Sequence, residues 1–258
     1  MSRIAERFAR LRSDKRKGFV AFVTAGDPSL DRTVEAALAL DAAGVDVLEL
    51  GVPFSDPLAD GPVIQRSSER ALARGVTLAG VLDVVGRIRS RSTLPLLIFS
   101  YANPVLRYGI ERLARDAREA GADGALITDL PPEEAADWLA IAREADLDTI
   151  FLAAPTSPDE RLKRVAEASR GFVYAVSRTG VTGERSALSD DATPLVARLK
   201  TLTAAPVALG FGIATPEQFA AAAAVADGVV VGSALVRFLE EKPDGDVAAQ
   251  VRWLTSRT

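Results

Sequence analysis

The sequence contains no cysteine and no histidine. Without cysteine, disulfides, thiol nucleophiles and cysteine-ligated metal sites are excluded. Without histidine, a Ser-His-Asp triad, an imidazole base and a histidine-ligated metal are excluded as well. If the chain is an enzyme, its proton transfers must therefore use Asp, Glu, Tyr or Lys. We expect chemistry without a metal and without a cofactor.

Long apolar runs and blocks of like charge are also missing. No stretch approaches the ~20 apolar residues that a membrane-spanning helix needs. The segment Ser2–Arg16 is charged and amphipathic, and no apolar segment typical of a secretory signal follows it. The formal net charge of −4 disfavours a nucleic-acid partner. These features predict a soluble, cytoplasmic protein.

Short apolar runs separated by segments of helical periodicity make up most of the chain. Of the 258 residues, 48% are hydrophobic, which is enough for a sizeable core. The runs are mostly continuous rather than alternating, as in parallel strands that are covered on both faces. Eight predicted strands follow one another along the chain: Gly18–Thr24, Val45–Leu50, Leu96–Ser100, Gly124–Thr128, Thr149–Ala153, Phe172–Val176, Val207–Gly210 and Gly228–Val231.

This alternation of strands and helices predicts an α/β protein with a parallel sheet. Eight units favour a closed (β/α)8 barrel that forms one domain over residues 1–258. An open sheet with one miscounted strand is the alternative. Ile4, Phe8 and Leu11 recur at helical spacing, and we expect this extra N-terminal helix to plug the bottom of the barrel. Gly44 and Gly121 precede strands and are predicted left-handed helix caps.

The stretch Leu48–Pro62 combines a strand with a stiff, proline-rich loop and holds three acids. Glu49 interrupts the end of an apolar run. A buried, unpaired carboxylate costs several kcal/mol, so Glu49 should face a wet or ligand-filled cavity. Asp56 and Asp60 follow in the loop. Either could be an ordinary turn residue, or could face one small molecule together with Glu49.

The loops after the last three predicted strands contain glycine and hydroxyl groups. Glycines let backbone N–H groups approach an anion, and barrels often bind phosphate after strands 7 and 8. Gly212, Gly232 and Ser233 fit such a site, with Gly183 reaching in from the loop after strand 6. Plain turns are the alternative for each glycine taken alone.

Aromatic and aliphatic side chains lie on or near the ends of the other strands. Some must be ordinary core, but those at the upper ends could hold a flat, apolar part of a ligand. Tyr174, inside the sixth predicted strand, needs a partner for its hydroxyl if it is buried, and protein or water could equally supply it. The apolar candidates are Phe22, Phe99, Tyr101, Leu126 and Phe151.

Four stretches closely resemble the family of tryptophan synthase alpha subunits. They are Leu48–Pro62, Tyr101–Asn103, Ser177–Gly183 and Gly210–Ile213, and the likeness covers essentially the whole chain in order. The first stretch is long and specific. The resemblance implies a lyase that cleaves indole-3-glycerol phosphate, by a retro-aldol reaction, to indole and glyceraldehyde 3-phosphate in tryptophan biosynthesis.

The resemblance also implies roles for individual residues. Glu49 matches the catalytic acid–base glutamate, Asp60 the aspartate at the indole nitrogen, and Tyr174 an auxiliary tyrosine. Thr182 matches a loop threonine that engages the Asp60 loop on closure. Phe22, Leu126 and Phe211 match the indole pocket, which Tyr101 adjoins, and Gly183, Gly212, Gly232 and Ser233 match the phosphate cradle.

A beta subunit is the partner that the resemblance implies, in an αββα complex that passes indole through a tunnel. Pro53, Asp56, Asn103 and Pro131 match positions on the alpha side of that interface. Two other functions stay open from the residues alone. One is another phosphosugar-binding barrel, an isomerase or decarboxylase, and the other is a regulatory subunit that senses a phosphorylated ligand.

Overall fold

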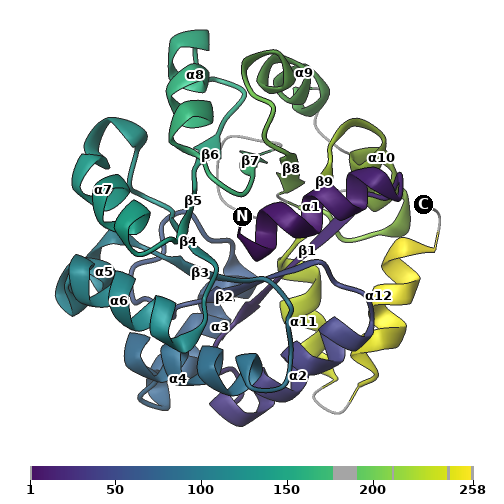
Figure 1. Ribbon diagram of the computed structural model, residues 1–258. Helices are drawn as coiled ribbons and strands as arrows, with labels where there is room; N and C mark the ends of the chain where they lie inside the picture. The colour runs from purple at the N-terminus through teal and green to yellow at the C-terminus, as the bar shows by residue number, and fades with distance from the viewer. Residues whose placement is uncertain (1, 177–190, 211, 243–244, 257–258) are drawn as a thin grey trace.

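The computed structural model describes residues 2–176, 191–210, 212–242 and 245–256. Parallel strands form a barrel, and helices surround it as a ring (Figure 1). The strands are β1 (Gly18–Thr24), β2 (Val47–Gly51), β3 (Leu96–Ser100), β4 (Gly124–Ile127), β5 (Asp148–Ile150), β6 (Leu152–Ala153), β7 (Val173–Val176), β8 (Val207–Gly210) and β9 (Gly228–Val231).

The helices are α1 (Arg3–Ser13), α2 (Leu30–Ala42), α3 (Pro62–Ala73), α4 (Leu78–Arg89), α5 (Ala102–Tyr108), α6 (Ile110–Ala120), η1 (Pro132–Glu134), α7 (Ala136–Glu144), α8 (Asp159–Ala168), α9 (Ala192–Leu202), α10 (Pro216–Val225), α11 (Ser233–Glu241) and α12 (Val247–Thr255). Helix α1 precedes the first strand, α2 to α10 connect successive strands, and α11 and α12 follow the last strand. Within the described ranges, none of them is both long and apolar enough to span a membrane.

The strand order β5-β4-β3-β2-β1-β9-β8-β7-β6 confirms the predicted (β/α)8 barrel. Its two end strands belong to one predicted strand, Thr149–Ala153, which Phe151 divides. Ile150 packs inside the barrel, Phe151 packs outside and Leu152 packs inside again, as in continuous extended chain. The Tyr174 backbone N–H donates to the Phe151 carbonyl at 3.1 Å, so the barrel closes through this strand.

The second strand differs from its prediction. It runs from Val47 to Gly51 rather than from Val45 to Leu50, because Val45 and Asp46 complete the turn after α2. Glu49 therefore lies in the middle of β2 and not at its tip, in register with Phe22 on β1 and Leu97 on β3. Gly44 and Gly121 have φ of 90° and 96°, which confirms both predicted left-handed caps.

Two apolar clusters stabilise the barrel on either side of its wall. One lies between strands and outer helices, and the other fills the barrel interior. Helix α1 closes the lower end of the interior with Ile4, Phe8 and Leu11, all buried, which confirms the predicted plug. In Figure 1, α1 crosses the barrel end that faces the viewer.

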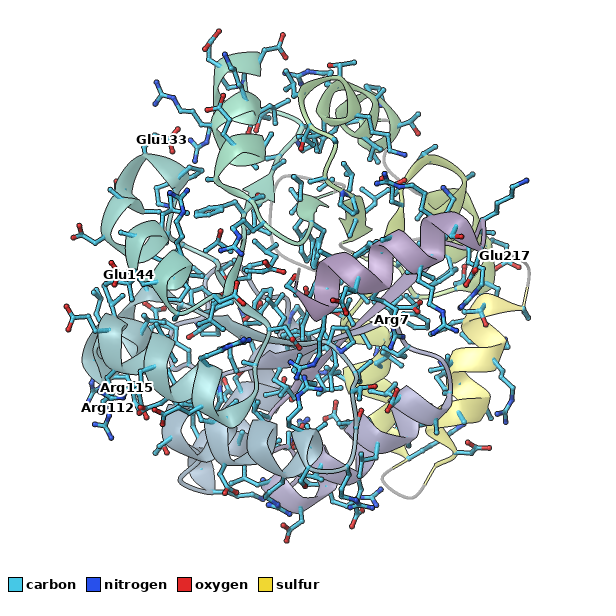
Figure 2. The ribbon with its side chains drawn as sticks, in the orientation of Figure 1. Arg7, Arg112, Arg115, Glu133, Glu144 and Glu217 are labelled. Carbon is cyan, nitrogen blue, oxygen red and sulfur yellow. The ribbon has the colours of Figure 1, made fainter. Side chains whose placement is uncertain are left out.

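Buried aspartates at the strand starts fasten this lower end. Asp46 accepts a hydrogen bond from the Phe19 backbone at 2.9 Å, and Asp123 accepts one from the Leu96 backbone at 2.8 Å. Two arginines of α1 neutralise them, since Arg3 pairs with Asp123 at 2.8 Å and Arg7 with Asp46 at 3.3 Å. Figure 2 labels Arg7 beside the helix that crosses the barrel. These contacts leave the opposite end of the barrel for a site.

Candidate active site

A buried carboxylate without a partner marks the upper interior of the barrel. Glu49 is 1% exposed, and neither of its carboxylate oxygens has a hydrogen-bond partner among the residues that the structure describes. Burial raises its pKa from the ordinary 4.5 to about 8. Since a buried polar group without a partner is costly to the fold, this arrangement makes Glu49 a candidate for exchanging a proton with a bound molecule.

Asp60 is the second acid at this end. It is buried at the end of the loop between β2 and α3, and burial raises its pKa to about 6. The Tyr101 hydroxyl opposes that shift by donating a hydrogen bond to the carboxylate. The same hydroxyl accepts the Ala59 N–H at 3.1 Å, and the Tyr101 ring lies 5.2 Å from that of Phe54. Tyr101 thus holds the loop that carries Asp60.

Tyr174 reaches the two acids from the opposite side of the barrel, on β7. Its pKa is raised well above the usual value, chiefly by burial and then by the charges of Glu49 and Asp60. The ring covers Gly210 on β8, where an added Cβ would lie 2.5 Å from the Tyr174 hydroxyl oxygen. Glycine at that position therefore makes room for the tyrosine inside the barrel.

One cavity of about 40 Å³ joins these groups. The rings of Phe22 and Phe99 meet edge to face at 5.1 Å and give it an aromatic wall. Its lining consists of Phe22, Glu49, Ala59, Asp60, Ile64, Phe99, Thr128, Tyr174, Gly212, Val230, Gly232 and Ser233. Acids from one βα connection, a tyrosine from a distant strand and two of the predicted glycines, Gly212 and Gly232, therefore line one cavity.

The part of the cavity lined by Gly212, Gly232 and Ser233 has the features of an anion site. Gly232 precedes α11 with non-helical backbone angles, so the first N–H groups of α11 begin at the cavity. Gly212 has a φ of 83°, a conformation that favours glycine. Thr182, Gly183 and Phe211 lie outside the described residues.

Two predicted site residues do not line the cavity. Leu126 is fully buried in the interior cluster. Tyr101 contacts the Asp60 loop through the hydrogen bond that its hydroxyl accepts from the Ala59 N–H. The structure adds Ile64 and Thr128, which sequence reasoning missed. Thr128 stands directly after β4, so the rule that sites lie at strand ends could have found it. No sequence signal marks Ile64, because its place depends on how α3 packs.

The four predicted interface residues follow β2, β3 and β4 at the same rim. Asp56 and Asn103 are exposed, Pro131 is half-buried and Pro53 is buried. Two apolar side chains at this rim face solvent, with Leu58 76% and Leu106 62% exposed.

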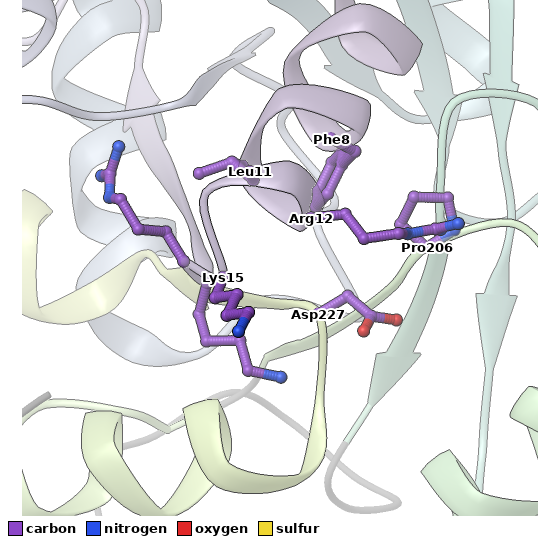
Figure 3. Close-up of a pocket in the computed structure, with 8 residues that line it drawn as sticks. Phe8, Leu11, Arg12, Lys15, Pro206 and Asp227 are labelled. Carbon is purple, nitrogen blue, oxygen red and sulfur yellow. The ribbon is translucent and has the colours of Figure 1, made fainter.

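A larger cavity of about 260 Å³ lies at the other end of the barrel, beside α1 (Figure 3). Phe8, Leu11 and Pro206 form its apolar side, and exposed Lys15 lies at its edge. Its carboxylate, Asp227, already accepts from Lys200 at 3.1 Å and from the Val207 backbone at 3.0 Å. At the upper cavity, by contrast, both acids have raised pKa values, and Glu49 has no hydrogen-bond partner among the described residues, which favours that cavity for chemistry.

Comparison with known proteins agrees with this geometry. A family profile described as "Tryptophan synthase alpha chain" matches residues 8–257. The tryptophan synthase alpha chain of Geobacter sulfurreducens is 51% identical over 99% of this chain and 97% of its own. The tryptophan synthase alpha chain of Solibacter usitatus is 52% identical over 95% of this chain and 91% of its own.

A solved structure of Mycobacterium tuberculosis tryptophan synthase superposes with a TM-score of 0.92 at 43% identity, covering 99% of this chain and 98% of that one. A solved structure of tryptophan synthase subunit alpha from Legionella pneumophila superposes with a TM-score of 0.90 at 37% identity. It covers 100% of this chain and 97% of that one. The chain described here therefore belongs to the tryptophan synthase alpha chain family.

Proposed function

We propose that Glu49 and Asp60 divide the acid–base work of the family's reaction between them. Membership of the family makes the chain a carbon–carbon lyase, which cleaves indole-3-glycerol phosphate to indole and glyceraldehyde 3-phosphate in tryptophan biosynthesis. The observation that carries the proposal is a buried glutamate without a hydrogen-bond partner in one cavity with a second acid. Another phosphosugar isomerase or decarboxylase, or a regulatory sensor, is not favoured.

The first step needs an acid at the ring and an anion at the ring nitrogen. With a pKa of about 8, Glu49 holds its proton near neutral pH and can give it to the indole carbon that bears the side chain. With a pKa of about 6, Asp60 is mostly ionised and can stabilise the positive charge that this protonation places on the nitrogen.

The second step reverses the proton transfer at Glu49. Its carboxylate takes the proton of the side-chain hydroxyl next to the ring. A carbon–oxygen double bond forms as the carbon–carbon bond breaks, and the bonding electron pair returns to the ring and neutralises the nitrogen. Indole and the aldehyde leave, and Glu49 is again protonated, so the cycle consumes no co-reactant.

The rest of the cavity supports this orientation of the substrate. Phe22 and Phe99 offer an apolar wall for the indole ring, and Tyr174 lies close enough to both acids to act as an auxiliary group. Gly212, Gly232 and Ser233, with the start of α11, suit the phosphate. Leu126 stabilises the wall from behind, and Thr182, Gly183 and Phe211 would complete the site.

The family implies a beta subunit as partner. We propose that the rim after β2, β3 and β4, with Pro53, Asp56, Asn103 and Pro131, docks it in an αββα complex. Exposed Leu58 and Leu106 on that rim support a protein partner, because large apolar side chains in solvent are typical of interfaces. A cytoplasmic location stays a prediction.

Replacing Glu49 by Gln tests the proposed chemistry. We expect indole release from indole-3-glycerol phosphate to fall by roughly 10³-fold or more, since an amide cannot transfer the proton. Glycerol 3-phosphate should bind the variant about as tightly as the wild type because it occupies the other end. Glu69→Gln, an exposed position on α3, is the matched control. Turnover by Glu49→Gln at the wild-type rate would refute the assignment.

A further inference from the structure

Arg70, in the last turn of α3, forms an ion-pair cluster that the proposed chemistry does not use. Its guanidinium donates two hydrogen bonds to Asp27 in the loop after β1, at 3.0 and 2.6 Å. Ser67, also on α3, donates to the same carboxylate at 2.8 Å. The remaining arm of Arg70 donates to Glu240, in the last turn of α11, at 2.7 Å.

The two helices joined in this way both begin at the cavity. Helix α3 starts at Pro62, directly after Asp60 and Gly61, and α11 starts at Ser233. They pack against each other, and Ile64 of α3 and Ser233 of α11 line the cavity. Arg70 lies roughly 12 Å along α3 from Pro62, at 1.5 Å per residue. A change in the relative tilt of the helices would therefore move Asp60 relative to the phosphate end.

We propose that Arg70 is a positioning residue that fixes the separation between the Asp60 end and the Gly232–Ser233 end of the site. The inference depends on the proposed function, because the separation matters only when one substrate spans both ends. Displacing reacting groups by about 1 Å can cost ~100-fold in rate without loss of any direct contact. Asp27 anchors Arg70 to the barrel wall, and Glu240 transmits that position to α11.

The planar guanidinium is suited to this task in a way that an ammonium is not. It presents a two-pronged face to Asp27 and still has an arm for Glu240, whereas lysine is a compact point charge. The side chains of Arg70 and Glu240 are about 30% exposed and that of Asp27 is 9% exposed, so the Asp27 contact is the better shielded of the two.

Two ligands that each resemble one half of the substrate, indole and glycerol 3-phosphate, distinguish a positioning role of Arg70 from a general loss of structure. For Arg70→Gln we expect kcat/KM for indole-3-glycerol phosphate to fall ~10- to 100-fold. The binding of indole alone and of glycerol 3-phosphate alone should stay within about threefold of the wild type, because each fragment uses one end only. Arg70→Lys should recover part of the loss. Arg66→Gln, an exposed arginine one turn earlier on α3, is the charge-matched control.

Two outcomes would overturn the inference. One is a kcat/KM for Arg70→Gln equal to that of Arg66→Gln, and the other is a parallel loss of both fragment affinities, which would indicate loosening of the site as a whole. If Arg70→Gln shows no cooperative thermal transition, Glu240→Gln decides, since it breaks only the link between the helices. We expect a ~3- to 10-fold fall in kcat/KM with unchanged fragment binding, and equality with Arg66→Gln would reject the link. A wild-type chain that leaves indole-3-glycerol phosphate uncleaved would instead refute the proposed function.

Discussion

At the scale of residues, Glu49 and Asp60 differ in how far they are removed from water and hydrogen-bond donors. Within the described part of the chain, neither carboxylate oxygen of Glu49, on strand β2, has a hydrogen-bond partner, whereas Asp60 receives a hydrogen bond from Tyr101. Burial raises both pKa values, to about 8 and about 6. One acid is therefore protonated and the other ionised near neutral pH, which is the pairing that the reaction needs.

This difference predicts a bell-shaped dependence of kcat/KM on pH. The rate should rise through about pH 6 as Asp60 ionises, and fall through about pH 8 as Glu49 loses its proton. Steady-state cleavage of indole-3-glycerol phosphate across this range checks the profile. Asp60→Asn should lack the acidic limb, and a flat wild-type profile would argue against the assignment of the two acids.

The buried Glu49 also lowers the stability of the folded chain, and the direction in which this effect changes with pH can be predicted. Its pKa is about 8 in the folded chain against an ordinary 4.5, so the folded state holds the proton more tightly. The unfolded state ionises first as pH rises between these values, and the wild type loses stability over that window. Glu49→Gln cannot ionise, so its free energy of unfolding should exceed that of the wild type by roughly 5 kcal/mol above about pH 8, at about 1.36 kcal/mol per pKa unit.

Urea unfolding at about pH 5 and about pH 8.5 measures this difference. The advantage of Glu49→Gln should be small at the lower pH and grow at the higher one. Glu69→Gln is the control, because its exposed side chain should leave the pH dependence as in the wild type. An advantage that shrinks as pH rises would contradict the raised pKa.

At the scale of elements, the two ends of the barrel differ. Packing and ion pairs stabilise the end that α1 closes, and the candidate active site lies at the other end. Helix α1 buries Phe8 against Phe172 with ring centroids 5.7 Å apart, at the end away from Glu49. The strand starts at that end are fastened by Asp46, Asp123 and their arginine partners. At the upper end, Glu49 lines a cavity, and no described residue forms a hydrogen bond with its carboxylate.

Phe8→Ala should therefore reduce stability and spare activity. Removing a buried aromatic ring leaves a cavity, so we expect the free energy of unfolding to fall by ~3 kcal/mol. At a temperature where the variant is folded, its kcat/KM should stay within about twofold of the wild type, because distant sites act independently. Chemical denaturation and the cleavage assay together check this, and a large loss of kcat/KM in the folded variant would show that α1 acts on the site.

At the scale of the whole molecule, the rim above the candidate active site is the surface that we propose for a partner. Leu106 on α5 is 62% exposed and lies three residues after Asn103, one of the predicted interface positions. Apolar anchors of this kind often contribute strongly to binding. The same rim includes the loop that carries Asp60, so a partner seated there could influence the acid directly.

Leu106→Asp should weaken association with a beta subunit by ~10-fold or more, because it places a charge in an apolar contact. Titration calorimetry against the purified beta subunit measures this. Leu202→Asp is the control, since Leu202 at the end of α9 is also exposed but lies away from the rim. Unchanged affinity for Leu106→Asp would place the partner elsewhere.

The sequence by itself determined the class of chemistry and the fold. An enzyme without histidine or cysteine must move protons with Asp, Glu, Tyr or Lys, and eight apolar runs separated by helical segments predict a barrel, since both features can be read without knowing the fold. Through its resemblance to the family, the sequence also predicted Glu49 and Asp60 as the acids, and both line one cavity. It misplaced the bounds of β2, because the turn after α2 takes Val45 and Asp46.

Which of these groups line one cavity, and how their pKa values differ, follows from the tertiary structure and not from any local pattern. Tyr174 meets Glu49 and Asp60 because the barrel closes, and Ile64 enters the site through the packing of α3. A pKa depends on the atoms that surround a group in space, and here they come from strands and loops far apart in the chain. For the same reason, no local pattern predicts that Arg70 joins α3 to Asp27 and to Glu240.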